Sequence, residues 1–135
     1  MVDTNVLVSA FRSRRGASNR VLVAAADGRF TMIASVPVFL EYEEVLKRAE
    51  HRLQHGLSLD QIDEVRRHLS AIIEPVEVRF LWRPQLRDPS DEMVLEAAIN
   101  GGAEAIVTYN VADFSAAARF NVATMTPQNF LNGLA

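Results

Sequence analysis

The sequence predicts an α/β fold, with three α/β/α layers around a central, mainly parallel sheet. Short apolar runs alternate with longer amphipathic stretches along the 135 residues, and strands separated by helices pair in parallel through right-handed crossovers. Acidic residues recur where apolar runs give way to polar ones. The length and the apolar fraction of 49% suit one domain, which we expect to span residues 1–135.

The first part of the chain predicts a strand, two helices and a second strand. Val2 stands at the end of a very short first strand, and residues 5–11 form a short helix that the polar segment 12–16 breaks. Ser18 is the expected N-cap of a helix that runs to Ala26. Residues 31–35 are typical of a strand.

The middle of the chain predicts two helices and a strand. Pro37 lies near the start of a helix that extends to about residue 49. Its apolar face has helical spacing and comprises Val38, Tyr42, Val45, Leu46 and Ala49. Ser58 and Gln61 form a capping-box pattern for a helix to about residue 73, and residues 76–80 alternate as a strand does.

The last part of the chain predicts two more strands and two helices. Residues 84–90 form a loop, and residues 91–100 form a helix that Gly101 and Gly102 close. Residues 105–108 are a short buried strand, and residues 122–125 are the last strand. Thr126 and Pro127 begin a final helix to about residue 134.

Four carboxylates carry the functional prediction: Asp3, Glu41, Asp91 and Asp113. Each lies just past a predicted strand or at the helix start that follows, and such positions gather in one crevice of an open α/β sheet. Carboxylates crowded there repel one another unless a cation neutralises them. Their oxygens suit Mg²⁺ or Mn²⁺, so the sequence predicts a metal-dependent enzyme that acts on phosphates.

Composition excludes several other classes. The chain has no cysteine, which rules out disulfides and thiolate zinc sites and is compatible with the cytoplasm. No apolar run approaches the roughly 20 residues that span a bilayer. The net charge is −3, yet nearly all basic residues are arginines, which pair with phosphates. The group that flanks the Asp3 segment supplies candidate RNA-binding residues: Arg12, Arg14 and Arg15.

Four ordered segments resemble the motifs of PIN-domain nucleases, which have a Rossmann-like fold. Residues 2–7 (VDTNVL) look like the first motif, and residues 40–46 (LEYEEVL) are similar to the second. Residues 87–91 (RDPSD) resemble the third, and residues 106–114 (IVTYNVADF) the fourth. The C-terminal segment, residues 126–131, resembles the end of the chain in one PIN subgroup, which is described as toxins of toxin–antitoxin pairs.

The resemblance implies a ribonuclease that binds Mg²⁺ or Mn²⁺ through the four carboxylates. Asp3 and Asp91 would be the firmest ligands, while Asp113 and Glu41 would bind the metal directly or through water. The neighbouring polar positions are Thr4, Asn5, Thr108 and Asn110, and many relatives carry a further Asp where Asn110 stands. The expected partners are an RNA substrate, a cognate antitoxin and a second copy of the chain.

The residue types fit this chemistry without a Ser, Cys or His nucleophile. A metal-bound water has a lowered pKa and can attack a phosphodiester at neutral pH. A carboxylate such as Glu41 or Asp113 could accept the proton of that water. The spacing of His51 and His55 allows a metal pair, although solvated surface positions are the favoured interpretation.

Other interpretations remain open at this stage. Asp3, Asp91 and Asp113 could each cap a helix or turn, Glu41 could lie on a helix surface, and Asp88 is expected to be structural. Trp82 could stack on an RNA base, but a position at a subunit interface or at the edge of the core is the favoured interpretation. A PIN-like module that binds RNA or protein but cleaves poorly is the alternative function. A receiver domain is disfavoured, because its expected lysine would have to be Lys47, which lies in a predicted helix.

Overall fold

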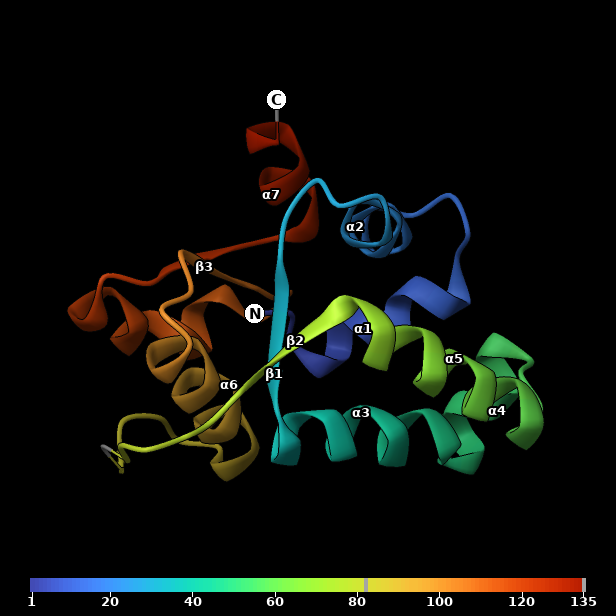
Figure 1. Ribbon diagram of the computed structural model, residues 1–135, viewed down its shortest axis with the longest axis horizontal. Helices are drawn as coiled ribbons and strands as arrows, with labels where there is room; N and C mark the ends of the chain where they lie inside the picture. The colour runs from blue at the N-terminus through green and yellow to red at the C-terminus, as the bar shows by residue number, and fades with distance from the viewer. Residues whose placement is uncertain (82, 135) are drawn as a thin grey trace.

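The predicted α/β fold is confirmed by the structure, a computed structural model that describes residues 1–81 and 83–134 (Figure 1). Trp82 lies outside the described residues, and so does the side chain of Ala49. In Figure 1, β1 runs through the middle of the molecule, with α6 on one side and α1, α4 and α5 on the other.

The described strands form two parallel pairs. β1 (Met32–Ser35) pairs with β2 (Ile73–Val76), and β3 (Ala105–Val107) pairs with β4 (Ala123–Met125). Val2 forms an isolated parallel bridge with Val107, at the position where the sequence predicts the end of the first strand. The start of the chain thereby lies alongside β3, and Asp3 follows directly.

The helices alternate with these strands as the sequence predicts. They are α1 (Thr4–Arg12), α2 (Ala17–Ala26), α3 (Val36–Lys47), α4 (Ala49–His55), α5 (Leu59–Ile72), α6 (Pro89–Asn100), the 3₁₀ segment η1 (Val111–Phe120) and α7 (Pro127–Gly133). The capping box of Ser58 and Gln61 is present at the start of α5, and Thr126 caps α7.

The core lies where α1, α3 and α6 pack on the strands. Val38, Tyr42, Val45 and Leu46 are all buried, which confirms these members of the predicted apolar face of α3. The hydroxyl group of Tyr42 donates a hydrogen bond to the backbone carbonyl of Val2. The buried face of α3 is therefore hydrogen-bonded to the short segment that leads into Asp3.

Several predicted boundaries are wrong, and in two places a contact with a distant residue is the reason. α2 begins at Ala17 with Gly16 at its N-cap, and Ser18 is buried, where its hydroxyl pairs with that of Tyr109. Residues 77–80 form no strand, because the side chain of Asn100 binds the backbone of Arg79 and Phe80. The predicted helix at Pro37 ends at Lys47, and a separate helix follows after Arg48.

Within the described part of the chain, no helix is both long and apolar enough to cross a membrane.

Candidate functional site

Asp3 occupies the point where the first bridge ends and α1 begins. Its side chain is only 6% exposed, and one carboxylate oxygen, Oδ1, accepts a hydrogen bond of 2.8 Å from the backbone N–H of Thr4. Burial raises the pKa of Asp3 above its ordinary value, although hydrogen bonds from Thr108 and Thr4 oppose the rise. Asp3 is therefore a capping residue and also a desolvated carboxylate.

Thr108 holds the second oxygen of Asp3. Its hydroxyl group donates a 2.7 Å hydrogen bond to Oδ2 of Asp3 and accepts one of 3.0 Å from the backbone N–H of Asn110. Thr108 is fully buried. Its position after β3 thus joins the Asp3 segment to the turn that leads into η1.

Glu41 lies on α3 and reaches the same region through Thr4. The hydroxyl group of Thr4 donates a 2.8 Å hydrogen bond to Oε2 of Glu41. Glu41 therefore does not behave as ordinary helix surface. The structure brings the first and second acidic segments together here.

Asp91 has the most perturbed acidity among these carboxylates. Its pKa is raised from an ordinary value of 3.8 to about 7, first by desolvation and then by repulsion from nearby carboxylates. The contributing residues are, in order of size, Asp3, Asp88, Asp113 and Glu41. The other three predicted acidic residues, Asp3, Glu41 and Asp113, therefore all raise the pKa of Asp91 by charge repulsion.

Asp88 lies just before α6 and carries a second role that the sequence analysis did not assign. Its Oδ1 accepts a hydrogen bond of 2.9 Å from the backbone N–H of Ser90, so it is the N-cap of the helix, as its expected structural role implies. Its charge also raises the pKa of both Asp3 and Asp91. The helix thus begins at Pro89, two residues before the predicted start at Asp91.

Asp113 and Asp91 line the same open pocket, which has a volume of about 490 Å³. The other lining residues come from the start of α6, from the loop before it, and from Ala112 and Ser115 of η1. Asp113 is exposed, and so is Asn110 at the N-cap of η1. The pocket leaves room for a polar ligand beside the acidic residues.

The arginines predicted to bind RNA follow the end of α1. Arg12, Arg14 and Arg15 are all exposed. Arg12 is already engaged, because its guanidinium lies 2.6 Å from Nδ1 of His51 on α4. Both ring nitrogens of His55 also have backbone partners, at Leu46 and Leu57, which disfavours a metal pair with His51.

A family model described as PIN domain matches residues 1–112. The chain belongs to the PIN domain family. A search of curated proteins and a search of solved structures gave no match. PIN domains are generally nucleases, so the family assignment indicates a hydrolase of nucleic acids.

PIN domains typically use divalent metal ions, and the residues of this chain fit such an ion in chemistry. The four predicted ligands all offer carboxylate oxygens, which hard cations prefer. A buried oxygen near them, Oδ1 of Asn5, has no hydrogen-bond partner. Among the residues described, no three acidic or histidine side chains form a ready-made cluster, so metal binding would require side chains to converge.

Two further carboxylates of the PIN domain were missed because they resemble ordinary helix surface in the sequence. Glu92 and Glu96 on α6 are 4% and 5% exposed. Oε1 of Glu92 accepts backbone hydrogen bonds from Gln85 and Leu86, at 2.7 and 2.8 Å. Glu96 pairs with Arg83 through two hydrogen bonds of 2.6 and 2.7 Å.

These two glutamates hold the loop that leads to Asp88. They lie four residues apart on one face of α6, and Asn100 continues that face by binding Phe80. Glu92 thereby holds Gln85 and Leu86, which line the pocket, and Glu96 holds Arg83 at the start of the same loop. The i,i+4 spacing of Glu92, Glu96 and Asn100 was the available signal, since three polar residues on a mostly buried helix need partners.

Proposed function

We propose that the chain is a metal-dependent endoribonuclease that hydrolyses RNA phosphodiester bonds with Mg²⁺ or Mn²⁺. The observation that carries this proposal is the carboxylate of Asp91, whose charge is opposed by four neighbouring carboxylates. Folding gathers like charges at a cost, and a divalent cation is the natural counter-charge. The adjacent pocket of about 490 Å³ gives a phosphodiester access.

The ligands in this proposal are Asp3, Asp91, Asp113 and Glu41. Thr108 and Thr4 would fix the rotamers of Asp3 and Glu41 through the hydrogen bonds described above, because a ligand must be oriented as well as present. Asn5 follows Asp3 by two residues, and its Oδ1, which has no hydrogen-bond partner, would be a further oxygen donor to the metal. Asn110 would border the site from the start of η1.

The bound metal would lower the pKa of a water molecule and offset charge on the phosphate. Asp113 or Glu41 would accept the proton of the attacking water, since each is at the edge of the group and not locked by two hydrogen bonds as Asp3 is. Arg14 and Arg15 would attract the RNA backbone.

We further propose that this nuclease is the toxin of a type II toxin–antitoxin pair. In this proposal it is a single domain over residues 1–135 that works in the cytoplasm as a homodimer with a cognate antitoxin protein. The support is the likeness of residues 126–131 to that PIN subgroup. A small reading frame next to the gene that encodes a binding protein would support it, and co-purification would test it.

The nuclease proposal is tested by incubating single-stranded and structured RNA with the protein in Mn²⁺, Mg²⁺ or EDTA. Asp91→Asn is the test variant, and Asp60→Asn is the matched control, because Asp60 is an exposed carboxylate on α5. Cleavage that requires metal, vanishes in Asp91→Asn and persists in Asp60→Asn is the expected result. Cleavage that persists in EDTA or in Asp91→Asn would contradict it.

A catalytically weak PIN-like module that binds RNA or protein is the second candidate. It is favoured by the lack of a preformed metal cluster among the described side chains and by Asn110 at the edge of the site. RNA retention on a filter in EDTA, together with no cleavage in any metal, would select this candidate over the nuclease.

A further inference from the structure

An aromatic side chain lies on the surface directly beside the candidate site. Tyr109 is 48% exposed and follows Thr108, whose hydroxyl group donates a hydrogen bond to Oδ2 of Asp3. Residues 109–113 are all exposed, and they lead from Tyr109 to Asp113 in the acidic pocket. The ring therefore belongs to the same surface segment as one of the proposed metal ligands.

Tyr109 is held in place both at its backbone and at its hydroxyl group. The backbone N–H of Thr108 donates a 2.9 Å hydrogen bond to the carbonyl of Met125, and the N–H of Asn110 donates one of 3.0 Å to the hydroxyl group of Thr108. At the other end, the hydroxyl group of Tyr109 is hydrogen-bonded to that of Ser18, which is 1% exposed. The ring has little freedom left to lose when a ligand covers it, and such preorganisation favours binding.

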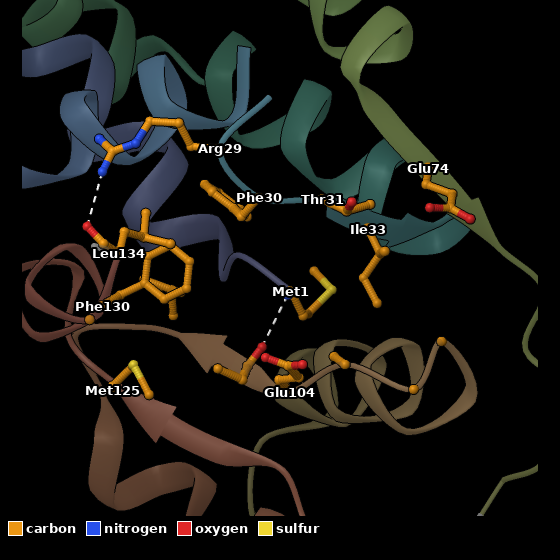
Figure 2. A pocket seen from close by; sticks show the side chains of 16 residues that line it. Met1, Arg29, Phe30, Thr31, Ile33, Glu74, Glu104, Met125, Phe130 and Leu134 are labelled. Carbon is orange, nitrogen blue, oxygen red and sulfur yellow. Dashed lines mark hydrogen bonds between the residues drawn. The ribbon is translucent and has the colours of Figure 1, made fainter. Parts of the chain in front are cut away.

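Contacts near both ends of α2 keep Ser18 in position. Near the start of the helix, the side-chain amide of Asn19 donates a 3.0 Å hydrogen bond to the carbonyl of Ala10 on α1. Just after its end, Figure 2 shows Arg29 hydrogen-bonded, at 3.0 Å, to the carbonyl of Leu134, the C-cap of α7. Packed helices therefore support the hydroxyl end of Tyr109.

The ring of Tyr109 lies between the acidic site and the arginines that we propose to attract RNA. Its backbone adjoins Thr108 beside that site, whereas its hydroxyl group reaches the start of α2. Arg14 and Arg15 are exposed and precede Ser18 by four and three residues. The Cα atoms of Arg15 and Ser18 are at most about 11 Å apart, because three peptide units join them. An RNA strand held by these arginines, with a phosphate at the carboxylates, would pass along the ring.

We propose that the ring of Tyr109 stacks on an unpaired base of the RNA, close to the nucleotide whose phosphate lies at the carboxylates. This inference rests on the proposed nuclease function and narrows its substrate class to single-stranded RNA. Stacking on an aromatic ring tolerates any base, because every base has a π face, and a continuous duplex keeps those faces inside the helix. Tyr109 would thereby select single strands without selecting a sequence.

The test compares two double variants that differ only in the ring. Ser18→Ala with Tyr109→Phe removes both hydroxyl groups and keeps the ring, and removal of both partners of a hydrogen bond is nearly neutral for stability. Ser18→Ala with Tyr109→Leu removes the ring as well. Fluorescence anisotropy in EDTA measures the affinity of each variant for a labelled oligouridylate and for an abasic oligomer of equal length, which keeps the phosphates and lacks the bases.

The variant with Tyr109→Phe should bind oligouridylate much as the wild-type chain does, and the one with Tyr109→Leu should bind it about fivefold more weakly or worse. Both should bind the abasic oligomer equally. Phe80→Leu is the control and should change neither affinity, because Phe80 is an exposed ring beside Asn100, at the far end of α6 from Asp91.

Three results would overturn the proposal. Equal affinity of the two double variants for oligouridylate would show that the base does not contact the ring. An equal loss for both oligomers in the variant with Tyr109→Leu would assign Tyr109 to the fold alone. Failure of the wild-type chain to bind oligouridylate would remove the RNA site altogether.

Cleavage assays separate this inference from the nuclease function. In Mn²⁺, the variant with Tyr109→Leu should lose preference for single-stranded over duplex RNA, whereas the variant with Tyr109→Phe should keep it. If the wild-type chain cleaves nothing but the difference in binding persists, stacking is supported and the nuclease function is contradicted. If both double variants cleave single strands as the wild-type chain does, with equal affinity, stacking is contradicted and the nuclease function stands.

Discussion

The hydroxyl group of Thr108 donates a hydrogen bond of 2.7 Å to Oδ2 of Asp3 across 105 positions of the sequence. Thr108 is completely buried, and Asp3 is nearly so. The contact links the two halves of the PIN domain at the candidate site, because Asp3 begins α1 and Thr108 follows β3. The other carboxylate oxygen of Asp3, Oδ1, accepts the hydrogen bond from the backbone N–H of Thr4.

Replacing this hydroxyl tests whether Thr108 orients Asp3. Thr108→Val keeps the shape but leaves Oδ2 of Asp3 and the N–H of Asn110 without this partner. Unfolding free energy in urea should fall by about 1–3 kcal/mol. Mn²⁺ affinity should fall about 10- to 100-fold, as for other residues that hold a ligand in place. Thr108→Ser should recover most of both; failure of that rescue would argue that the methyl group matters instead.

The crowded carboxylates predict how the stability of the metal-free protein depends on pH. The folded-state pKa of Asp91 is about 7, above its ordinary value of 3.8, so ionised Asp91 opposes folding. In EDTA, the contribution of Asp91 to the free energy of unfolding should therefore become more favourable to the folded state as pH falls from about 8 through 7 toward 5.

Removing the charge of Asp91 should remove part of this dependence. Asp91→Asn should raise the melting temperature in EDTA at pH 8 and flatten its change with pH. Because Asp91 is only half-buried, solvent screening limits the expected gain to about 1 kcal/mol. Differential scanning calorimetry with Asp60→Asn as the control measures it. A melting temperature lowered by Asp91→Asn at pH 8 would show that the carboxylate is stabilising.

Glu92 should support the loop before Asp88 through its acceptor oxygen. Glu92→Ala removes the partner of two backbone N–H groups, at Gln85 and Leu86, and should cost about 2–3 kcal/mol in urea unfolding. Glu92→Gln keeps an oxygen at that position and should cost less. Hydrogen exchange of residues 85–88 should accelerate in the alanine variant, and unchanged exchange there would separate Glu92 from the loop.

Arg14 and Arg15 should contribute to RNA affinity through phosphate contacts alone. The double variant Arg14→Gln, Arg15→Gln should bind single-stranded RNA more weakly, and each lost contact should reduce the slope of log affinity against log salt by about 0.7. Arg67→Gln, at an exposed position on α5, is the control. Filter binding in EDTA from low to high salt gives the slopes; identical slopes would place the RNA on another face.

The sequence predicted the order and kind of most elements because local signals agreed with tertiary packing. The capping box at Ser58, the Pro near the start of α3 and the glycines after α6 each act within a few residues. Gly102 adopts φ of 64°, where glycine is favoured, and so ends the helix before β3.

The errors arose where a distant partner decided the local structure. The sequence pattern at Ser18 is typical of an N-cap, but its hydroxyl group is buried and hydrogen-bonded to that of Tyr109. Residues 77–80 alternate as a strand does, but Asn100 takes their backbone groups. Glu92 and Glu96 look like solvated surface because their partners lie in a loop whose path the sequence does not specify.

The sequence predicts which carboxylates belong to the candidate site, but it does not predict how they affect the pKa of Asp91. The placement of Asp3, Glu41, Asp91 and Asp113 after strands and at helix starts indicates that they converge. The hydrogen bond from Thr4 to Glu41 and the charge of Asp88 depend on how α3 and α6 pack, and no local pattern encodes them.

Isothermal calorimetry with Mn²⁺ at pH 8 tests most directly whether these carboxylates form a metal site. The wild-type chain should bind the ion, Asp3→Asn and Asp91→Asn should each weaken binding at least about tenfold, and Asp60→Asn should leave it unchanged. Equal Mn²⁺ affinity in the wild-type chain, Asp3→Asn and Asp91→Asn would contradict the account.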